Sequence, residues 1–202
     1  MYAAKPEDRA RVLNRAARER ALIQAAAKLF AARGYEATTT REIAAAAGCA
    51  EGLISRYFKG KAGLLRALIQ LHFEEEAEEF RDDSAPAATL AEDIVRRVMW
   101  DVQHISEDHE FLRIIVPHFL LTPELAREVA EVGPGRHRKL VLEKLRNHSS
   151  FCSLPEEEQE TLAELISAIG FMFGFWIPAM GEDRAGAKRR AAAVAKILAR
   201  AF

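Results

Sequence analysis

The chain has few of the residues that build metal centres or disulfide scaffolds. Only 2 of its 202 residues are cysteine, and Cys49 and Cys152 lie too far apart for a metal-ligand or disulfide spacing. No uninterrupted apolar run reaches the roughly 18–20 residues of a membrane span. We find no secretory signal pattern, phosphate-binding loop or nucleophile motif. We therefore expect a cytoplasmic chain that is not an enzyme, has no membrane segment, and uses neither a metal nor a cofactor.

What the sequence does have is helical periodicity over almost its whole length. Half of the residues are hydrophobic, which is enough for a sizeable core. Apolar residues recur at helical spacing, and we find no strand-like alternation and no internal repeat. The pattern predicts an all-α fold of about nine helices. A three-helix domain at 1–61 is expected to precede a larger helical domain at 62–202, and 82–88 is the clearest loop.

The near-zero net charge conceals an uneven distribution along the chain. Residues 1–65 carry 12 Lys and Arg against 6 Asp and Glu, a net charge of +6, whereas the remainder carries 17 against 24, a net charge of −7. A basic first third is typical of a nucleic-acid-binding domain joined to a body that does not bind nucleic acid. The N-terminal Lys5, Arg9 and Arg11 are either a DNA-contacting arm or a solvated tail.

The stretch from Thr39 to Lys61 has the pattern of two short helices around a tight turn. Thr39 and Glu42 have capping-box spacing at the start of a first helix over 40–47. Gly48 permits the left-handed conformation that closes this helix, and a second helix is expected over 50–58. This is the pattern of a helix-turn-helix whose second helix enters the DNA major groove. An ordinary corner between two helices has the same spacing, so that alternative stays open.

The residues of this stretch also carry a family resemblance. From Leu22 to Leu71 the chain resembles the DNA-binding domain of the tetracycline-repressor (TetR) family of bacterial transcriptional regulators. The resemblance rests on these residues at their fixed spacings: Gly34, Tyr35, Thr38, Thr39, Ile43, Ala44, Ala47, Gly48, Gly52, Tyr57, Phe58, Lys61 and Leu64.

The resemblance implies roles for individual positions. Thr40, Arg41, Tyr57 and Lys61 match phosphate-contacting positions, whereas Glu51, Gly52 and Ser55 match positions that face bases. Chemistry is consistent with this division, since Lys and Tyr suit phosphate. The DNA-binding residues that we predict are Thr39, Thr40, Arg41, Glu51, Gly52, Leu53, Ser55, Arg56, Tyr57 and Lys61.

Three positions depart from the family pattern and bear on which operator is read. Ala50 stands where Ser or Thr usually caps the second helix, Leu53 replaces a usual Thr, and Ser55 replaces a frequent Tyr. Glu51 is either an acceptor for a cytosine amino group or only a complement to the helix dipole.

Within the larger domain, bulky apolar side chains and a few histidines suggest a ligand cavity. The family typically binds a small molecule in this region, and an aromatic cavity with a few polar groups suits an apolar ligand. The alternative is that these side chains only fill the core. The spacing of His104 and His109 does not favour a metal. The predicted pocket residues are Trp100, His104, Phe111, His118, Phe119, Phe171, Phe175 and Trp176.

The last two predicted helices suggest self-association. Ser153 and Glu156 have capping-box spacing, and the helix that follows is apolar nearly all round up to Ile177. A helix that is apolar on every side must be covered on every side. The resemblance implies a dimer through two C-terminal helices of each subunit; the alternative is a monomer core. The predicted interface residues are Leu165, Ala168, Ile169, Met172, Val194 and Ile197.

Taken together, these patterns predict a homodimeric, sequence-specific transcriptional regulator. The preferred hypothesis is a repressor that leaves a palindromic double-stranded DNA operator when a small apolar or aromatic ligand binds. The alternative is a DNA-binding architectural or protein-partner module of the same fold without an effector.

Overall fold

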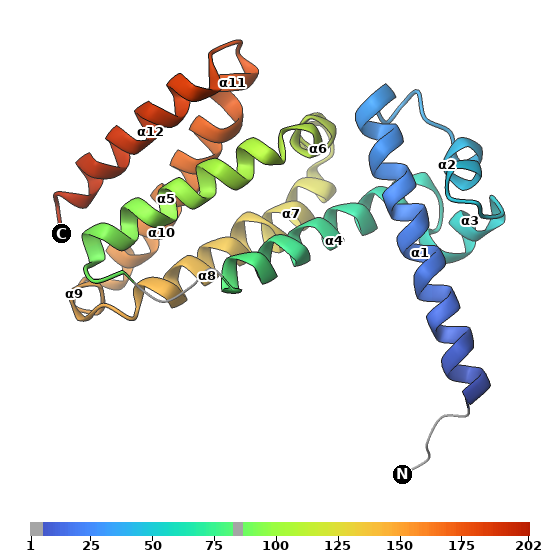
Figure 1. Ribbon diagram of the computed structural model, residues 1–202, viewed down its shortest axis with the longest axis horizontal. Helices are drawn as coiled ribbons and strands as arrows, with labels where there is room; N and C mark the ends of the chain where they lie inside the picture. Colours follow the sequence, from blue (N-terminus) through green and yellow to red (C-terminus); the bar gives the residue numbers. More distant parts are fainter. Residues whose placement is uncertain (1–5, 83–86) are drawn as a thin grey trace. The chain divides into compact units, whose positions relative to one another are not determined.

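The computed structural model of the chain describes residues 6–82 and 87–202, with side chains from residue 14 onward, and within these ranges it contains helices and no strands (Figure 1). The all-α prediction is therefore confirmed. The basic N-terminal residues Lys5, Arg9 and Arg11, and most of the predicted loop at 82–88, lie outside the described side chains. The chain divides into two compact units, Met1–His72 and Phe73–Phe202.

The first unit contains α1 (Pro6–Arg33), α2 (Thr40–Ala46), α3 (Gly52–Phe58) and the beginning of α4 (Lys61–Asp82). Its core is built by apolar residues that recur at helical spacing on α1 and by one or two buried residues from each short helix. Leu22, Ala26, Phe30, Ile43 and Ile54 are at most 1% exposed. Helix α4 crosses the division between the units, so its residues belong partly to each unit.

The second unit holds the rest of α4 and a series of further helices. These are α5 (Leu90–Glu107), α6 (His109–Leu121), α7 (Pro123–Val132), α8 (Pro134–Leu145), α9 (Ser149–Cys152), α10 (Glu156–Phe171), the π-helical η1 (Met172–Trp176), α11 (Ile177–Ala179) and α12 (Arg184–Ala199). Helix α5 is central, because it packs against α8, α10, η1 and α12. The core of the unit includes Val98, Val102, Ile166 and Ala195.

Helix α5 buries charge as well as apolar surface. Asp93, Arg97 and Asp101 follow one another at four-residue spacing, and each is at most 1% exposed. The Arg97 Nε atom lies 3.4 Å from Asp93 Oδ1, and the guanidinium stacks over the Phe80 ring at 5.1 Å. His148 Nε2 lies 2.8 Å from Asp93 Oδ2. Buried ions need such partners, because each pays a desolvation penalty on leaving water.

The starts of two helices show where local pattern succeeds and where it fails. Thr89 and Glu92 form a complete capping box at the start of α5. The predicted box between Ser153 and Glu156 is wrong, because α10 begins after Pro155 without a side-chain cap. The Ser153 hydroxyl donates instead to the Ser150 carbonyl at 2.7 Å.

The stretch Glu156–Ala179 is long and apolar enough to span a membrane by length and composition, with a mean hydropathy of 1.6 in its most apolar window, a third of which is buried. In this fold it packs closely against α5. A Cβ at Gly170 would lie 2.5 Å from the Asp101 Cβ, and a Cβ at Gly174 would lie 2.9 Å from the Ile105 Cβ. These two glycines therefore allow close approach between helices of the same chain.

Candidate nucleic-acid interface

The end of α1 and the loop after it form the support of the site. Gly34 ends α1 with φ +82°, and its amide donates to the Phe30 carbonyl at 2.8 Å. Thr38 is 1% exposed, and its hydroxyl donates to the Gly34 carbonyl at 2.8 Å. The Tyr35 ring lies 5.1 Å from the Phe30 ring. These contacts fix the loop that connects α1 to α2.

The predicted capping box at the start of α2 is confirmed. The Glu42 amide donates to the Thr39 hydroxyl at 3.2 Å, and the Thr39 amide donates to the Glu42 carboxylate at 2.9 Å. Glu42 also pairs with Arg33 at 3.0 Å. The pKa of Glu42 is lowered, chiefly because the Thr39 amide and hydroxyl donate to its charged form, with a smaller contribution from Arg33. The box therefore holds the first turn of the helix that presents Thr40 and Arg41.

A tight turn at Gly48 joins α2 to α3. Gly48 has φ +63°, which a side chain would strain, and its amide donates to the Ala45 carbonyl at 3.1 Å. The Cys49 amide donates to the Ala44 carbonyl at 2.9 Å. Helix α3 then begins at Gly52, two residues later than predicted. Ile54 is its buried anchor, whereas Ser55 and Arg56 are exposed.

Glu51 stands at the start of α3, and its carboxylate makes no capping hydrogen bond to that helix. The Thr40 hydroxyl donates to Glu51 Oε1 at 2.7 Å instead. This contact joins the first turns of the two short helices. The Glu51 carboxylate is thereby directed toward α2. It does not complement the dipole of α3 through a capping hydrogen bond.

The Lys61 side chain makes contacts within its own unit, and its predicted role at phosphate stays a prediction. Its ammonium donates to the carbonyls of Tyr35 and Thr38, each at 3.0 Å, and lies 4.3 Å from the centroid of the Tyr35 ring. Burial is the main reason that the pKa of the Tyr35 phenol is raised. The ammonium thus ties α4 to the loop before α2.

Two further contacts shape the interface. The sequence analysis did not identify the second of them, at Gly63. The Arg15 guanidinium of α1 lies over the Tyr57 ring, 5.1 Å from its centroid. Gly63 allows the backbone of α4 to lie close to the end of α3, because a Cβ at Gly63 would lie 1.6 Å from the Phe58 carbonyl oxygen. A glycine inside a helical pattern was the signal for such a contact.

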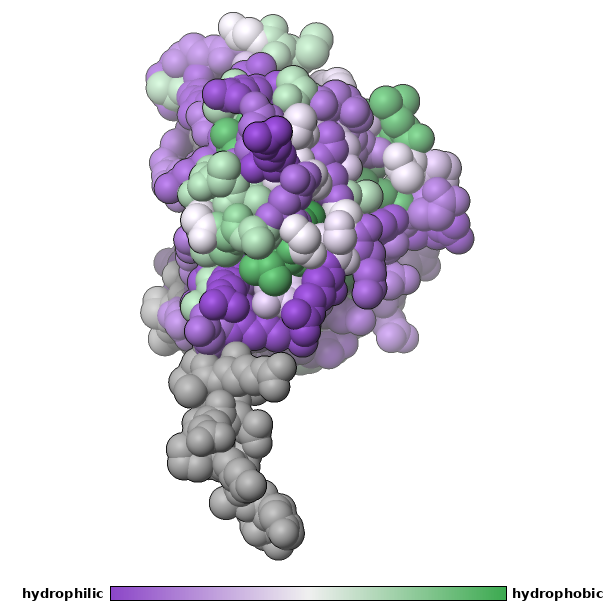
Figure 2. All heavy atoms as spheres, turned by 90° about the vertical axis from the view of Figure 1, so that its right-hand side faces the viewer, coloured by the Kyte–Doolittle hydropathy of each residue, from purple (hydrophilic) through white to green (hydrophobic). Residues whose placement is uncertain are grey.

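The predicted DNA-binding residues gather on these first turns and on α3. Thr39, Arg41, Glu51, Gly52, Ser55 and Arg56 are exposed, and Thr40, Leu53, Tyr57 and Lys61 are half-buried. The side of the molecule on which α2 and α3 lie is mainly hydrophilic, with smaller apolar areas between the polar groups (Figure 2). Exposed polar groups on a rigid pair of short helices form a surface that can meet the edge of a DNA groove.

The predicted pocket residues make their ring contacts within the second unit in separate groups, and their role in a ligand cavity stays a prediction. Trp100 stacks on His104 at 3.6 Å, and His104 Nε2 lies 2.9 Å from Glu79. Phe111 packs on Phe73, while Phe171 packs on Phe175. His118 and Phe119 are half-buried on α6. Trp176 is 46% exposed, which places it on the surface rather than in an internal pocket.

The predicted interface residues lie mostly on the surface of the second unit. Leu165 is 43% exposed, Met172 44% and Ile197 63%, and Ala168 is exposed as well. Ile169 and Val194 are half-buried. Trp176 belongs with this exposed apolar group by its exposure and by its place in η1 next to α10. We name the group Leu165, Met172, Trp176 and Ile197 the apolar face.

Fold and site together define a helical protein with an N-terminal helix-turn-helix domain. Residues 22–68 match the family model described as bacterial regulatory proteins, tetR family. The HTH-type transcriptional regulator YvkB of Bacillus subtilis is 47% identical over 51 residues, which cover 25% of this chain and 27% of YvkB. The chain thus matches about a quarter of the length of that relative, in the region of the DNA-binding domain.

Solved structures match over nearly the whole chain. A TetR-family transcriptional regulator from Mesorhizobium loti has a TM-score of 0.72 at 21% identity, with 91% of this chain and 95% of that chain covered. FadR of Bacillus subtilis, solved in complex with stearoyl-CoA, has a TM-score of 0.63 at 20% identity, with 87% and 96% covered. At these identities the likeness shows the fold. Residues 22–68 therefore match the DNA-binding domain of TetR-family bacterial regulatory proteins, and the chain shares the fold of solved TetR-family regulators.

Proposed function

We propose that this chain is a cytoplasmic, homodimeric transcriptional repressor that binds a palindromic operator in double-stranded DNA. The observation that carries the proposal is the helix-turn-helix, in which a capping box, the Gly48 turn and the Thr40–Glu51 hydrogen bond hold an exposed row of polar residues. Two such heads would read successive major-groove faces, with half-sites roughly 34–36 Å apart or a multiple of that distance.

The division of labour that we propose within the head follows from chemistry. Arg41 and Arg56 are exposed cations that suit phosphate, and Tyr57 offers a hydroxyl donor. Glu51 has only acceptor atoms and repels phosphate, so a cytosine amino group is its natural partner. Gly52, Leu53 and Ser55 follow it on α3 and would face the neighbouring bases. Lys61 supports the loop before α2 rather than contacting phosphate.

The apolar face supports dimerisation. Four large hydrophobic side chains, Leu165, Met172, Trp176 and Ile197, are between 43% and 63% exposed on α10, η1 and α12. Exposed apolar groups of this kind commonly mark an interaction surface. A second copy would cover them and would supply the second head that a palindrome requires.

The effector in this proposal is a ligand with a long apolar portion. FadR of Bacillus subtilis shares the fold and was solved with stearoyl-CoA. That ligand belongs to FadR, and we take it only as the reason to test acyl compounds first. An effector releases DNA when it binds the released conformation more tightly than the DNA-bound one.

The decisive experiment is footprinting of the purified protein on the DNA beside its own coding region, with excess random DNA and at several salt concentrations. We expect a protected palindrome that survives competition. Arg41→Ala should weaken binding to all sequences and reduce the salt dependence. Lys28→Ala, an exposed change on α1, is the control for loss of a head charge. If excess random DNA removes the protection, the protein is not a sequence-specific regulator of this site.

The alternative is a DNA-binding architectural or protein-partner module of the same fold without an effector. If an operator is found and no acyl compound changes its affinity, this alternative is preferred.

A further inference from the structure

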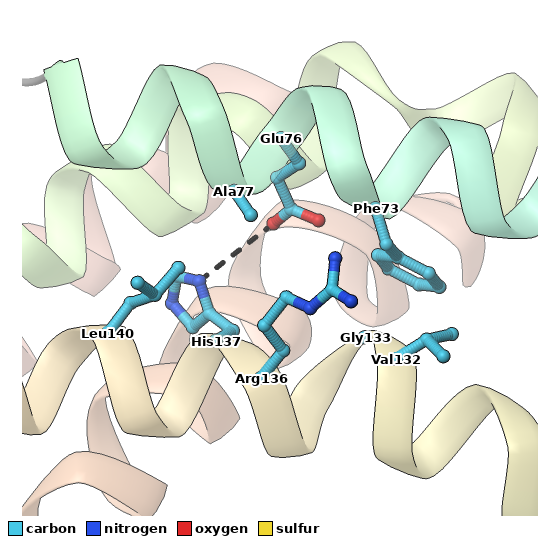
Figure 3. A pocket seen from close by; sticks show the side chains of 8 residues that line it. All are labelled: Phe73, Glu76, Ala77, Val132, Gly133, Arg136, His137 and Leu140. Carbon is cyan, nitrogen blue, oxygen red and sulfur yellow. Dashed lines mark ion pairs between the residues drawn. The ribbon is translucent and has the colours of Figure 1, made fainter. Parts of the chain in front are cut away.

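A small cavity lies between α4 and the corner that joins α7 to α8 (Figure 3). Its volume of ≈ 10 Å³ is close to the minimum that holds one water molecule. A cavity of this size holds one water-sized group, so a larger group of a ligand can enter only where a lining side chain moves out. The lining residues are Phe73, Glu76, Ala77, Val132, Gly133, Arg136, His137 and Leu140.

His137 lies at this cavity between two carboxylates. Its Nε2 atom lies 3.0 Å from Asp101 of α5, and its Nδ1 atom lies 4.0 Å from Glu76 of α4. Burial by itself would lower the pKa of His137, and so would the nearby Arg97. The carboxylates of Asp101 and Glu76 outweigh both effects, so the pKa is raised above its ordinary value.

Arg136 brings a positive charge beside His137. Figure 3 shows its side chain rising from α8 toward α4, between Glu76 and Phe73. Among the residues that the structure describes, no hydrogen bond or ion pair to the Arg136 guanidinium is found. Its forked donors are thus available to a carboxylate, which guanidinium binds in a bidentate manner.

The remaining lining is apolar, and its shape depends on a glycine. Phe73, Ala77, Val132 and Leu140 surround the charged groups. The Phe73 ring rests on the Gly133 backbone, because a Cβ at Gly133 would lie 2.6 Å from its Cζ atom. A ligand with a charged end and an apolar body matches this combination of residues.

We propose that the cavity binds the carboxylate of an amphiphilic effector, with Arg136 and His137 as its cationic partners and Glu76 as the carboxylate that it displaces. Glu76 is already the weaker partner of His137, at 4.0 Å against 3.0 Å for Asp101. Its displacement would remove an ion pair between α4 and α8. Because α4 is continuous from Lys61 to Asp82, this is a direct route from the ligand to the helix shared by both units. Only this last step rests on the proposed function.

The test measures binding on the protein alone, by calorimetry and thermal shift, without DNA. The probes are saturated fatty acids of increasing chain length, each compared with its methyl ester. We expect the acid to bind and raise Tm, and the ester to bind at least tenfold more weakly. Binding of acid and ester with equal affinity, or no binding of any acid, would overturn the proposal.

Three variants separate a ligand contact from a structural role. Arg136→Gln should weaken acid binding at least tenfold without lowering Tm of the free protein. Arg138→Gln removes an adjacent cation that pairs with Glu164 outside the cavity lining, and it should bind like wild type. Glu76→Gln should strengthen acid binding because the competing carboxylate is gone; a purely structural Glu76 would give weaker binding or none.

The outcomes also distinguish this proposal from the proposed function. If the acid binds but no operator is found, the carboxylate site stands and the repressor assignment fails. If an operator is found but Arg136→Gln binds acid as wild type does, the repressor assignment stands and this site is wrong.

Discussion

The Lys61 ammonium lies over the Tyr35 ring, 4.3 Å from its centroid, and donates to the carbonyl of the same residue at 3.0 Å. It also donates to the Thr38 carbonyl at 3.0 Å. These contacts of the Lys61 ammonium close the loop before α2. This relationship changes what a substitution at Lys61 should do.

Lys61→Ala should destabilise the protein rather than only weaken its contact with DNA. Loss of hydrogen bonds to a charged group costs about 1.5–3 kcal/mol. Denaturant unfolding should show this loss, whereas Lys28→Ala on the exposed side of α1 should change stability by less than about 0.5 kcal/mol. Unchanged stability together with a smaller salt dependence of DNA binding would restore the phosphate role.

Gly63→Ala should disrupt the junction of α3 and α4. The new Cβ would lie 1.6 Å from the Phe58 carbonyl oxygen, so the backbone must move, and we expect a loss of more than about 3 kcal/mol. Gly52→Ala is the matched control, because nothing lies within 4 Å of its Cβ position. Ala at position 52 should leave stability unchanged or raise it by about 0.5–1 kcal/mol. Equal unfolding midpoints for the two variants would contradict this packing.

Glu51→Ala should change which operator is preferred. A side chain that accepts from cytosine contributes about 1–3 kcal/mol of discrimination at one base pair. Selection from randomised operators should show relaxed preference at one position in each half-site. Thr40→Val should give a smaller change in the same direction, because the Thr40 hydroxyl orients the carboxylate. A preference identical to that of wild type in both variants would show that Glu51 does not read a base.

The apolar face predicts which substitutions should prevent dimerisation. Met172→Glu and Ile197→Glu each place a charge on a side chain that is exposed in the single chain, 44% and 63% respectively. We expect both variants to be folded monomers in light scattering. Leu121→Glu is the control, since Leu121 is 83% exposed but lies at the end of α6. Dimers in all three variants would move the interface elsewhere.

The pKa of His137 predicts a direction for stability against pH. Because its folded pKa is raised above the unfolded value, its contribution is complete below about pH 6.5 and is lost as pH rises through the folded pKa. The unfolding midpoint of wild type should therefore fall between about pH 6 and about pH 9 by more than that of His137→Gln. Parallel curves for wild type and His137→Gln would contradict the ion pairs.

Local pattern in the sequence was enough for much of the head. The capping box at Thr39 and Glu42 depends on two residues three apart, and the Gly48 turn depends on one backbone conformation. The same local reasoning failed at Ser153, because Pro155 placed the start of α10 beyond its reach. Local signals are therefore reliable where no neighbouring residue offers the backbone a different start.

By itself the sequence determined the helices, the helix-turn-helix and the resemblance of its first domain to TetR-family regulators, because these depend on periodicity, fixed spacings and short-range hydrogen bonds. Only the tertiary structure decided the partners of long side chains. Lys61 meets a loop 26 residues away, the Asp93–Arg97–Asp101 row of α5 lies inside the core, and Arg136 points into a cavity beside His137. A charged residue on a helix has the same spacing whether it faces water or a distant carboxylate, so its role is settled only when the helices pack.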